Sequence, residues 1–148
     1  MIIMATKKIL VMGLPTSGKT TFAEELKKQL EFLNYSVTSY NADIIRKLTN
    51  NWDFSEKGRM KQARKMRQLA REATTNFVIC DFIAPLAEQR KFFNADIIIW
   101  MDTIDAGPYE DTNQAFDRNI NFDYRITEKN SGYWGEVIAI KIHNSIKN

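Results

Sequence analysis

Residues 13–20, with the sequence GLPTSGKT, carry the most specific chemical signal in the chain. They match the pattern G-x-x-x-x-G-K-[ST], in which two glycines allow a tight loop whose backbone N–H groups point at phosphate oxygens. In this pattern the lysine reaches the β- and γ-phosphates of a nucleotide, and the hydroxyl of the last residue binds Mg²⁺. We therefore predict a site for ATP and Mg²⁺, with Thr20 as a metal ligand. The residues assigned to ATP are Gly13, Pro15, Thr16, Ser17, Gly18, Lys19, Thr20 and Thr21.

A second set of polar residues, Asn41, Asp43 and Arg46, follows a predicted strand. In a doubly wound sheet this position lies at the carboxyl edge, the same edge as the phosphate loop. A carboxylate there can take the proton of an attacking hydroxyl or hold Mg²⁺, and an arginine can bind an anionic group of the acceptor. We assign Asp43 to catalysis together with Lys19, and both Asp43 and Arg46 to the substrate. The alternative, an aspartate at a helix start followed by a solvent-facing arginine, stays open.

Asp81 stands near the end of another apolar run, residues 77–83. An acid at the end of a buried strand is typical of the carboxylate that assists Mg²⁺ beside a phosphate loop. The predicted metal residues are therefore Thr20, Asp43 and Asp81.

The elements that must position these groups are visible in the periodicity. Residues 7–12 form an apolar run before the phosphate loop, and residues 19–32 carry apolar side chains at helical spacing. Further strands are predicted at 35–40, 77–83, 95–102 and 123–127, and further helices at 55–74, 86–93 and 133–146. Strands that are apolar on both faces and separated by helices indicate a parallel sheet covered on both sides. We predict a single three-layer α/β domain over residues 1–148, with a mainly parallel five-stranded sheet.

Composition excludes several other chemistries. The chain has 148 residues, a net charge of +3, one cysteine and one histidine. This composition argues against an internal disulfide, a zinc site and a Ser-His-Asp triad. The longest apolar run, residues 97–101, is far shorter than the ~20 residues that span a bilayer. The N-terminus also lacks the apolar stretch of a signal peptide. We expect a cytoplasmic protein without a membrane partner.

Five motifs in order make the sequence similar to a known family. They are GLPTSGKTT at 13–21, NADIIR at 41–46, FSEKGRMKQAR at 54–64, IAP at 83–85 and GPYE at 107–110. These resemble the G-L-x-G-S-G-K-[ST]-T, D-G-D-N-[VI]-R, F-S-x-E-D-R-x-E-N-x-R, I-S-P and D-P-Y-E segments of the adenylylsulfate kinases. That family phosphorylates the 3′-hydroxyl of adenosine 5′-phosphosulfate (APS) with ATP.

The resemblance implies a site for a small, nucleotide-like anionic acceptor. It implies that Phe54 stacks on the acceptor adenine and that Arg59 and Arg64 bind the acceptor, with Gln62 in place of the family's asparagine. The full set of acceptor residues is Asp43, Arg46, Phe54, Arg59, Gln62, Arg64 and Ile83. The family also implies the strand order 2-3-1-4-5, and a homodimer is an open expectation.

Two departures bear on mechanism. The family's basic lid follows the fourth strand, but residues 102–117 contain no lysine or arginine. The lid is predicted to be shortened, so that either another group stabilises the transferring phosphoryl or turnover is slow. Tyr109 and Phe116 in this segment can either close over an adenine or anchor the segment to the core. The second departure is Asp81, which stands where the family usually has a small residue.

Two other functions stay open. The set Asn41, Asp43 and Arg46, together with Asp81, also resembles the 5′-polynucleotide kinases, and the predicted helix at 55–74 is strongly basic. Its cations are Lys57, Arg59, Lys61, Arg64, Lys65, Arg67 and Arg71, against Glu56 and Glu72. A kinase acting on a 5′-hydroxyl of a polynucleotide or a modified nucleoside is therefore the alternative, with nucleic acid as the less favoured partner. The other alternative is a nucleotide-binding switch that transfers no phosphate.

Overall fold

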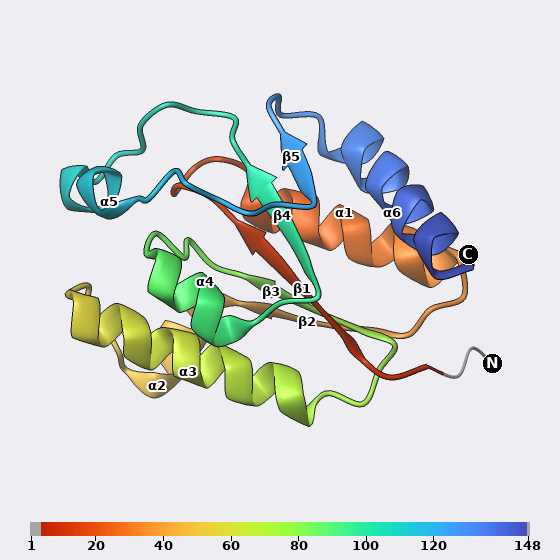
Figure 1. Cartoon of the computed structure of the whole chain (residues 1–148), viewed down its shortest axis with the longest axis horizontal. Helices are drawn as coiled ribbons and strands as arrows, with labels where there is room; N and C mark the ends of the chain where they lie inside the picture. The colour runs from red at the N-terminus through yellow and green to blue at the C-terminus, as the bar shows by residue number, and fades with distance from the viewer. Residues whose placement is uncertain (1–3, 148) are drawn as a thin grey trace.

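The computed structural model describes residues 4–147 and shows one parallel sheet with helices on both faces (Figure 1). The strands are β1 (Lys7–Met12), β2 (Val37–Asn41), β3 (Phe77–Asp81), β4 (Ile97–Met101) and β5 (Tyr124–Ile126). Their order in the sheet is β2-β3-β1-β4-β5, and each of the four pairings is parallel. The predicted fold class and strand order are confirmed.

The helices cover the two faces of the sheet in separate groups. They are α1 (Lys19–Phe32), α2 (Ala42–Thr49), α3 (Glu56–Glu72), α4 (Ala87–Phe93), α5 (Glu110–Ala115) and α6 (Ser131–Lys147). Helices α1 and α6 pack together on one face, and α2, α3 and α4 lie on the other (Figure 1). The short helix α5 stands apart, beyond the carboxyl ends of the strands. None of the helices within residues 4–147 is long and apolar enough to cross a membrane.

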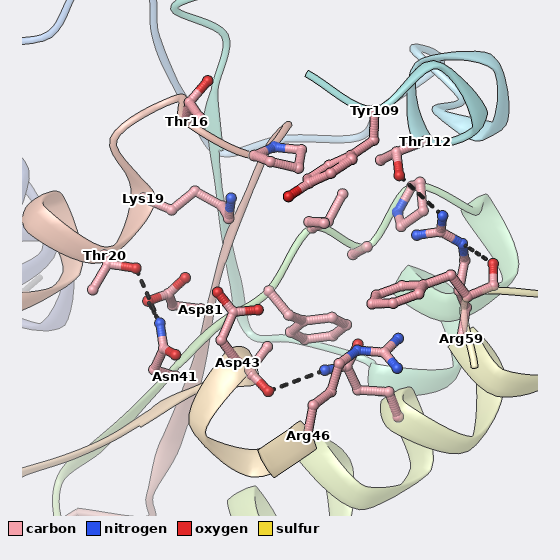
Figure 2. Close-up of a pocket in the computed structure, with 18 of the residues that line it drawn as sticks. Thr16, Lys19, Thr20, Asn41, Asp43, Arg46, Arg59, Asp81, Tyr109 and Thr112 are labelled. Carbon is pink, nitrogen blue, oxygen red and sulfur yellow. Dashed lines mark hydrogen bonds between the residues drawn. The ribbon is translucent and has the colours of Figure 1, made fainter. Parts of the chain in front are cut away.

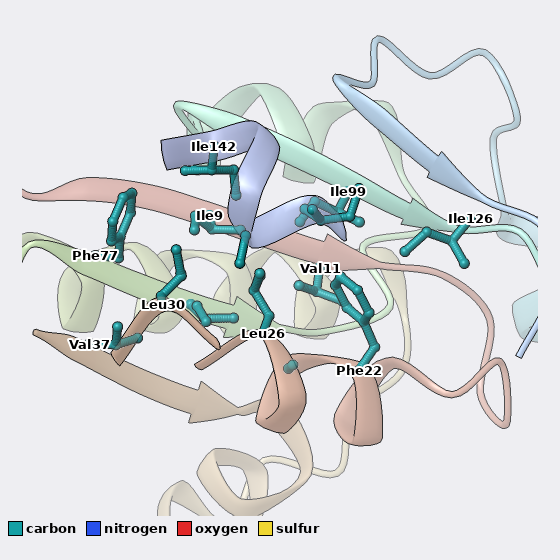
Figure 3. Close-up of a cluster of buried hydrophobic side chains, with 14 of the residues drawn as sticks. Ile9, Val11, Phe22, Leu26, Leu30, Val37, Phe77, Ile99, Ile126 and Ile142 are labelled. Carbon is teal, nitrogen blue, oxygen red and sulfur yellow. The ribbon is translucent and has the colours of Figure 1, made fainter. Parts of the chain in front are cut away.

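Strand β1 shows why the central strands are apolar throughout. Ile9 and Val11 face the cluster under α1 and α6, where they meet Phe22 (Figure 3). Leu10 and Met12 point the other way, into the cluster under α3 and α4. Because side chains alternate across a strand, a strand covered on both faces needs apolar residues at every position. This strand ends at the phosphate loop, so the double core fixes the direction from which that loop starts.

The element bounds agree closely where the local pattern is strong. Strand β1 and helix α1 lie where they are predicted, and Ser55 caps α3 by accepting the N–H of Gly58 at 3.3 Å. Strand β3 ends at Asp81, two residues earlier than predicted, which leaves residues 82–83 to turn into the site. The sequence patterns do not predict α2 and α5. Helix α5 has six residues and is too short to show a helical period.

Candidate active site

A cavity of about 790 Å³ opens at the carboxyl edge of the sheet. It is lined by the phosphate loop, the start of α2, the segment 52–62, the residues after β3 and the residues around the start of α5 (Figure 2). The predicted phosphate and acceptor residues share this cavity, except Gly13, Ser17 and Arg64, which do not line it. We call the part beside residues 13–21 the phosphate end and the part beside residues 46–62 and 108–112 the acceptor end.

Both glycines of the phosphate loop are required by its backbone. A Cβ at Gly13 would lie 2.6 Å from the carbonyl oxygen of Met101, and Gly18 has φ +94°. Thr16 also has a positive φ, 70°, which a β-branched residue rarely adopts. Strain of this kind at a ligand loop persists only where the surrounding structure holds it. The surrounding structure thus holds the phosphate loop in one strained conformation.

Lys19 begins α1 and extends across the loop, where its Nζ donates to the carbonyl oxygen of Leu14 at 3.1 Å. Burial lowers the pKa of Lys19, while the charges of Asp81 and Asp43 act in the opposite direction. The ammonium therefore stands beside the loop with two carboxylates near it. This is the arrangement that a lysine needs to contact terminal phosphates.

Asn41 connects the phosphate loop to the end of the neighbouring strand. Its Nδ2 donates to Thr20 Oγ1 and to Asp81 Oδ2, each at 3.0 Å (Figure 2). Its Oδ1 accepts the N–H of Ile44 at 3.1 Å and so caps α2. Burial raises the pKa of Asp81, although the hydrogen bond from Asn41 and the charge of Lys19 both lower it.

Asn41 and Asp81 are register partners in the pairing of β2 with β3. These are two of the positions at which the sequence departs from the family motifs: an amide replaces an acid at 41, and an acid replaces a small residue at 81. An amide can donate to the neighbouring carboxylate, whereas a second carboxylate would repel it. The two departures therefore belong together. The acid that the family has at position 41, on β2, is missing here, and an acid stands instead at position 81, on the adjacent strand β3.

The donors at the phosphate end fit Mg²⁺. In phosphotransferases this ion is usually held by one or two protein oxygens together with substrate phosphates and waters. Thr20 and Asp81 place a hydroxyl and a carboxylate on the same amide, and Asp43 lies in the first turn of α2 beside them. Within residues 4–147 there is no cluster of three or more acidic, histidine or cysteine ligands. The site suits an ion that arrives with a nucleotide.

Arg46 supports the acceptor end from behind. Its side chain is buried and donates to the carbonyl oxygens of Asn51 at 2.7 Å and Asp53 at 3.2 Å. Its guanidinium lies 4.3 Å from the ring centroid of Phe54. Phe54 is half-exposed and lines the cavity, so one face of its ring is held by the arginine and the ring is available to a ligand.

Arg59 ties the acceptor end to α5. Its Nε donates to the carbonyl oxygen of Phe54 at 2.8 Å and its Nη2 to Thr112 Oγ1 at 3.1 Å (Figure 2). Asp111 lies 3.9 Å from the same guanidinium. Burial lowers the pKa of Arg59 and the charge of Asp111 raises it. The arginine lines the cavity, but its charge is shared with an acid on the opposite wall.

The three remaining acceptor assignments differ in where the structure places them. Gln62 lines the cavity, where its amide donates to the carbonyl oxygen of Ala42 at 3.3 Å, and Ile83 lines it as well. Arg64 lies outside the cavity, on the exposed side of α3, beside a separate hollow that Arg67 also lines. Five residues along an α-helix turn a side chain by about 140°. Arg64 therefore cannot face the same side as Arg59.

The comparison with family models is decisive, because the adenylylsulphate kinase model matches residues 5–100. The chain belongs to the adenylylsulphate kinase family. It is 35% identical over 82 residues to the adenylyl-sulfate kinase of Halothermothrix orenii, a match that covers 53% of this chain and 44% of that protein. It is 30% identical over 105 residues to the probable adenylyl-sulfate kinase of Archaeoglobus fulgidus, covering 69% and 68%. The chain thus matches less than half the length of the first of these relatives.

Solved structures support the fold. The APS kinase CysC of Mycobacterium tuberculosis, in complex with AMPPNP and APS, superposes with a TM-score of 0.73 at 20% identity, covering 97% of this chain and 98% of that one. The shikimate kinase of Acinetobacter baumannii, in complex with shikimate, gives a TM-score of 0.56 at 17% identity, covering 96% and 93%. At these identities the likeness is one of fold, and this member of the adenylylsulphate kinase family shares it.

The structure adds lining residues that the motifs do not single out. Trp52, Asp111 and Thr112 line the acceptor end, together with Tyr109. Trp52 stands two residues before Phe54, where the motif at 54–64 begins. This pair of aromatic residues was the sequence signal that could have assigned Trp52 to the acceptor end. Asp111 and Thr112 approach from a helix that the sequence does not predict, and no local pattern pairs them with Arg59.

The two aromatic residues of the segment after β4 have different places. Phe116 is 7% exposed and belongs to the core under α3 and α4, so it anchors the segment. Tyr109 is 61% exposed and lines the cavity. Arg90 assists the anchoring, because it donates to the carbonyl oxygens of Ala84, Pro85 and Asp117 at 2.7 to 2.9 Å.

Proposed function

We propose that this chain transfers the γ-phosphoryl group of ATP to the 3′-hydroxyl of APS, giving ADP and 3′-phosphoadenylylsulfate. The observation that carries the proposal is one cavity with a phosphate loop at one end and a half-exposed aromatic ring backed by arginines at the other. Asp43 lines the cavity between these ends (Figure 2). Membership of the adenylylsulphate kinase family supports the choice of donor and acceptor.

In the proposed reaction, Asp43 accepts the proton of the 3′-hydroxyl while the oxygen forms a bond to the γ-phosphorus. The bond from that phosphorus to the bridging oxygen breaks, and ADP leaves with the electron pair. Lys19 and backbone N–H groups of the phosphate loop hold the charged oxygens in place. Mg²⁺, carried by Thr20 and Asp81 with the nucleotide, would neutralise the β- and γ-phosphate charge.

At the acceptor end, Phe54 supplies the face on which the APS adenine stacks. Arg46 holds this ring by its buried contact and so fixes the orientation of the stacked base. Stacking of a base on an aromatic side chain contributes about 1–3 kcal/mol. Arg46 and Arg59 are the arginines that line this end, and an anionic acceptor meets them there.

The placement of the basic residues of α3 favours a small acceptor over a polynucleotide. Lys57, Lys61 and Arg64 are exposed on α3 and do not line the cavity. A polynucleotide whose end entered the cavity would need cations along the path that leads out of it. A cytoplasmic location and a homodimer stay predictions from the sequence.

The test is transfer of labelled γ-phosphate from ATP with Mg²⁺ to APS, to nucleosides and to oligonucleotides. We expect label on APS alone, absent with Lys19→Ala and retained with Lys28→Ala, which removes a lysine on the exposed side of α1. Label on oligonucleotides, with binding that weakens steeply as salt rises, would replace the proposal with the polynucleotide kinase alternative. Hydrolysis of ATP without transfer to any acceptor would favour the nucleotide-binding switch.

A further inference from the structure

The segment that follows β4, residues 102–117, lacks the cations expected of a kinase lid. Residues 102–117 contain no lysine or arginine, and the next two arginines are already bound. Arg125 contacts Asp102 Oδ2 at 2.6 Å, and Arg118 lies 3.6 Å from Asp102 Oδ1. The cations that line the cavity are Lys19, Arg46 and Arg59, none of which comes from this segment.

The first half of this segment is fixed on the phosphate loop. Thr103 Oγ1 donates to the carbonyl oxygen of Ser17 at 2.7 Å. Gly107 packs against Pro15 so closely that a Cβ would lie 3.1 Å from the Pro15 carbonyl oxygen. Asn113 holds Gly107 from the other side, accepting its N–H at 2.7 Å and donating to its carbonyl oxygen at 2.9 Å. The residues leading to Tyr109 thus have little freedom relative to the loop that binds phosphate.

The second half is fixed on α3 and on the segment before α4. Thr112 accepts a hydrogen bond from the buried Arg59, and Phe116 is buried in the core. The N–H of Asp117 donates to the carbonyl oxygen of Pro85 at 2.7 Å. The segment is therefore a wall that is already in place, not a long basic lid that swings over the nucleotide.

Tyr109 begins at the acceptor end, and its side chain reaches from this wall toward the phosphate end (Figure 2). It is largely exposed and lines the cavity, and Figure 2 shows its ring reaching from the start of α5 with the hydroxyl directed toward the side of Lys19. A neutral hydroxyl can donate a hydrogen bond to a phosphoryl oxygen, and the segment on either side of Tyr109 is already fixed by hydrogen bonds.

We propose that the Tyr109 hydroxyl donates a hydrogen bond to a non-bridging oxygen of the phosphoryl group during transfer, in place of a lid cation. The inference rests on the proposed phosphoryl transfer but not on the identity of the acceptor. Tyr109 keeps its proton throughout: the acceptor oxygen gains the phosphoryl group, ADP leaves with the electron pair, and the acceptor proton goes to Asp43. Tyr109 is then a catalytic residue that sequence motifs alone do not assign.

The decisive variant is Tyr109→Phe, which removes only the hydroxyl. We expect kcat with APS to fall by the order of 10²-fold, the scale for loss of one donor to a developing oxyanion. The KM values for ATP and APS should stay within about twofold, because the ring and the wall remain. The matched control is Tyr133→Phe, an exposed tyrosine on α6 that does not line the cavity, and its kcat should equal that of the wild type. An unchanged kcat in Tyr109→Phe would overturn the proposal.

A second measurement does not depend on the acceptor. Calorimetric binding of ADP with aluminium fluoride and Mg²⁺ mimics the phosphoryl group in transit. Tyr109→Phe should weaken this complex by about tenfold or more, while the affinity for ADP alone is unchanged. If the wild type fails to phosphorylate APS but the variant still weakens the aluminium fluoride complex, only the APS assignment falls. If the variant binds the complex as tightly as the wild type, the role of Tyr109 falls, whatever the acceptor is.

Discussion

The phosphate end of the cavity is built from residues close together in the sequence, whereas the acceptor end is assembled from distant segments. Lys19 donates to the carbonyl oxygen of Leu14, five residues away, within one loop. At the acceptor end, Arg59 bonds to Thr112, 53 residues away, and the amide of Gln89 donates to the carbonyl oxygen of Arg59 across 30 residues. A short motif can therefore specify the first end, but only the folded chain creates the second.

The two ends also differ in how their charges are used. At the phosphate end, Lys19, Asp43 and Asp81 lie near one another without a direct ion pair among the contacts within residues 4–147. At the acceptor end, Arg46 and Arg59 donate hydrogen bonds to backbone carbonyl oxygens of the cavity wall. The charged groups of the phosphate end are therefore available to substrates, whereas the arginines of the acceptor end chiefly hold the cavity wall in place. Substitutions at the two ends should accordingly separate effects on kcat from effects on KM.

The largest effect is expected for Lys19→Ala at the phosphate end. Within residues 4–147, no other lysine or arginine lines the cavity beside the phosphate loop, so transfer should fall by roughly 10³-fold or more. Calorimetry with Mg²⁺ should also show much weaker ATP binding. If the ATP affinity stayed within about twofold, a change of ~0.4 kcal/mol, the assignment of the phosphate end would be wrong.

Asp43→Asn is expected to have the next largest effect. Loss of a general base lowers kcat by roughly 10²-fold or more, while ATP binding by calorimetry should persist. Asp105→Asn, which changes an exposed aspartate outside the cavity, is the matched control and should retain full turnover. Full turnover by Asp43→Asn itself would move the essential carboxylate to Asp81.

The difference between the two ends also explains how far the sequence could be read. The phosphate loop, β1 and α1 could be predicted because motif, apolar run and helical period agree within 26 residues, 7–32. Helix α2 could not, since its cap comes from Asn41 and its eight residues leave Ile44 and Leu48 exposed. Eight residues are also fewer than the ~11–18 over which a helical period can be read.

For the site, the limit was geometry across long separations. The family motifs select Phe54, Arg59 and Gln62, which line the cavity. They also select Arg64, which the helical turn carries away from the cavity. The contacts of Arg59 with α5 depend on where residues 110–115 fold, and no spacing in the sequence encodes that. The shape of the acceptor end therefore had to come from the structure.

Phe54→Ala tests the acceptor end and should act on KM. Loss of about 1–3 kcal/mol of stacking predicts a KM for APS that is roughly 5- to 150-fold higher, with the ATP KM unchanged. Phe32→Ala, at the exposed end of α1, is the control for removing a phenyl group from the surface. Steady-state kinetics with each substrate varied in turn measures both values. An equal rise in both KM values would mean that the two ends are not independent.

The smallest effect is expected for Asp81→Asn, measured as stability. Burial raises the pKa of Asp81 above its ordinary value, so the ionised carboxylate destabilises the folded state at neutral pH. An asparagine retains an oxygen that can accept from Asn41 and carries no charge. At pH 7 the variant should be more stable than the wild type by about 1 kcal/mol, or ~3 °C in Tm, even though its transfer activity falls.

The pH dependence of the stability difference between Asp81→Asn and the wild type provides a separate test of its sign. A group with a raised folded-state pKa contributes stability below its unfolded pKa and loses it as pH rises through the folded pKa. The advantage of Asp81→Asn should therefore be full at pH 7 and shrink as pH falls through the raised pKa of Asp81. It should vanish below about pH 3.9, where the carboxyl is protonated in both states. Thermal unfolding of both proteins across this range measures it. If the variant is less stable than the wild type at pH 7, the attraction of Lys19 and the hydrogen bonds to Asp81 outweigh the cost of burying the carboxylate. In that case the ionised Asp81 stabilises the phosphate end.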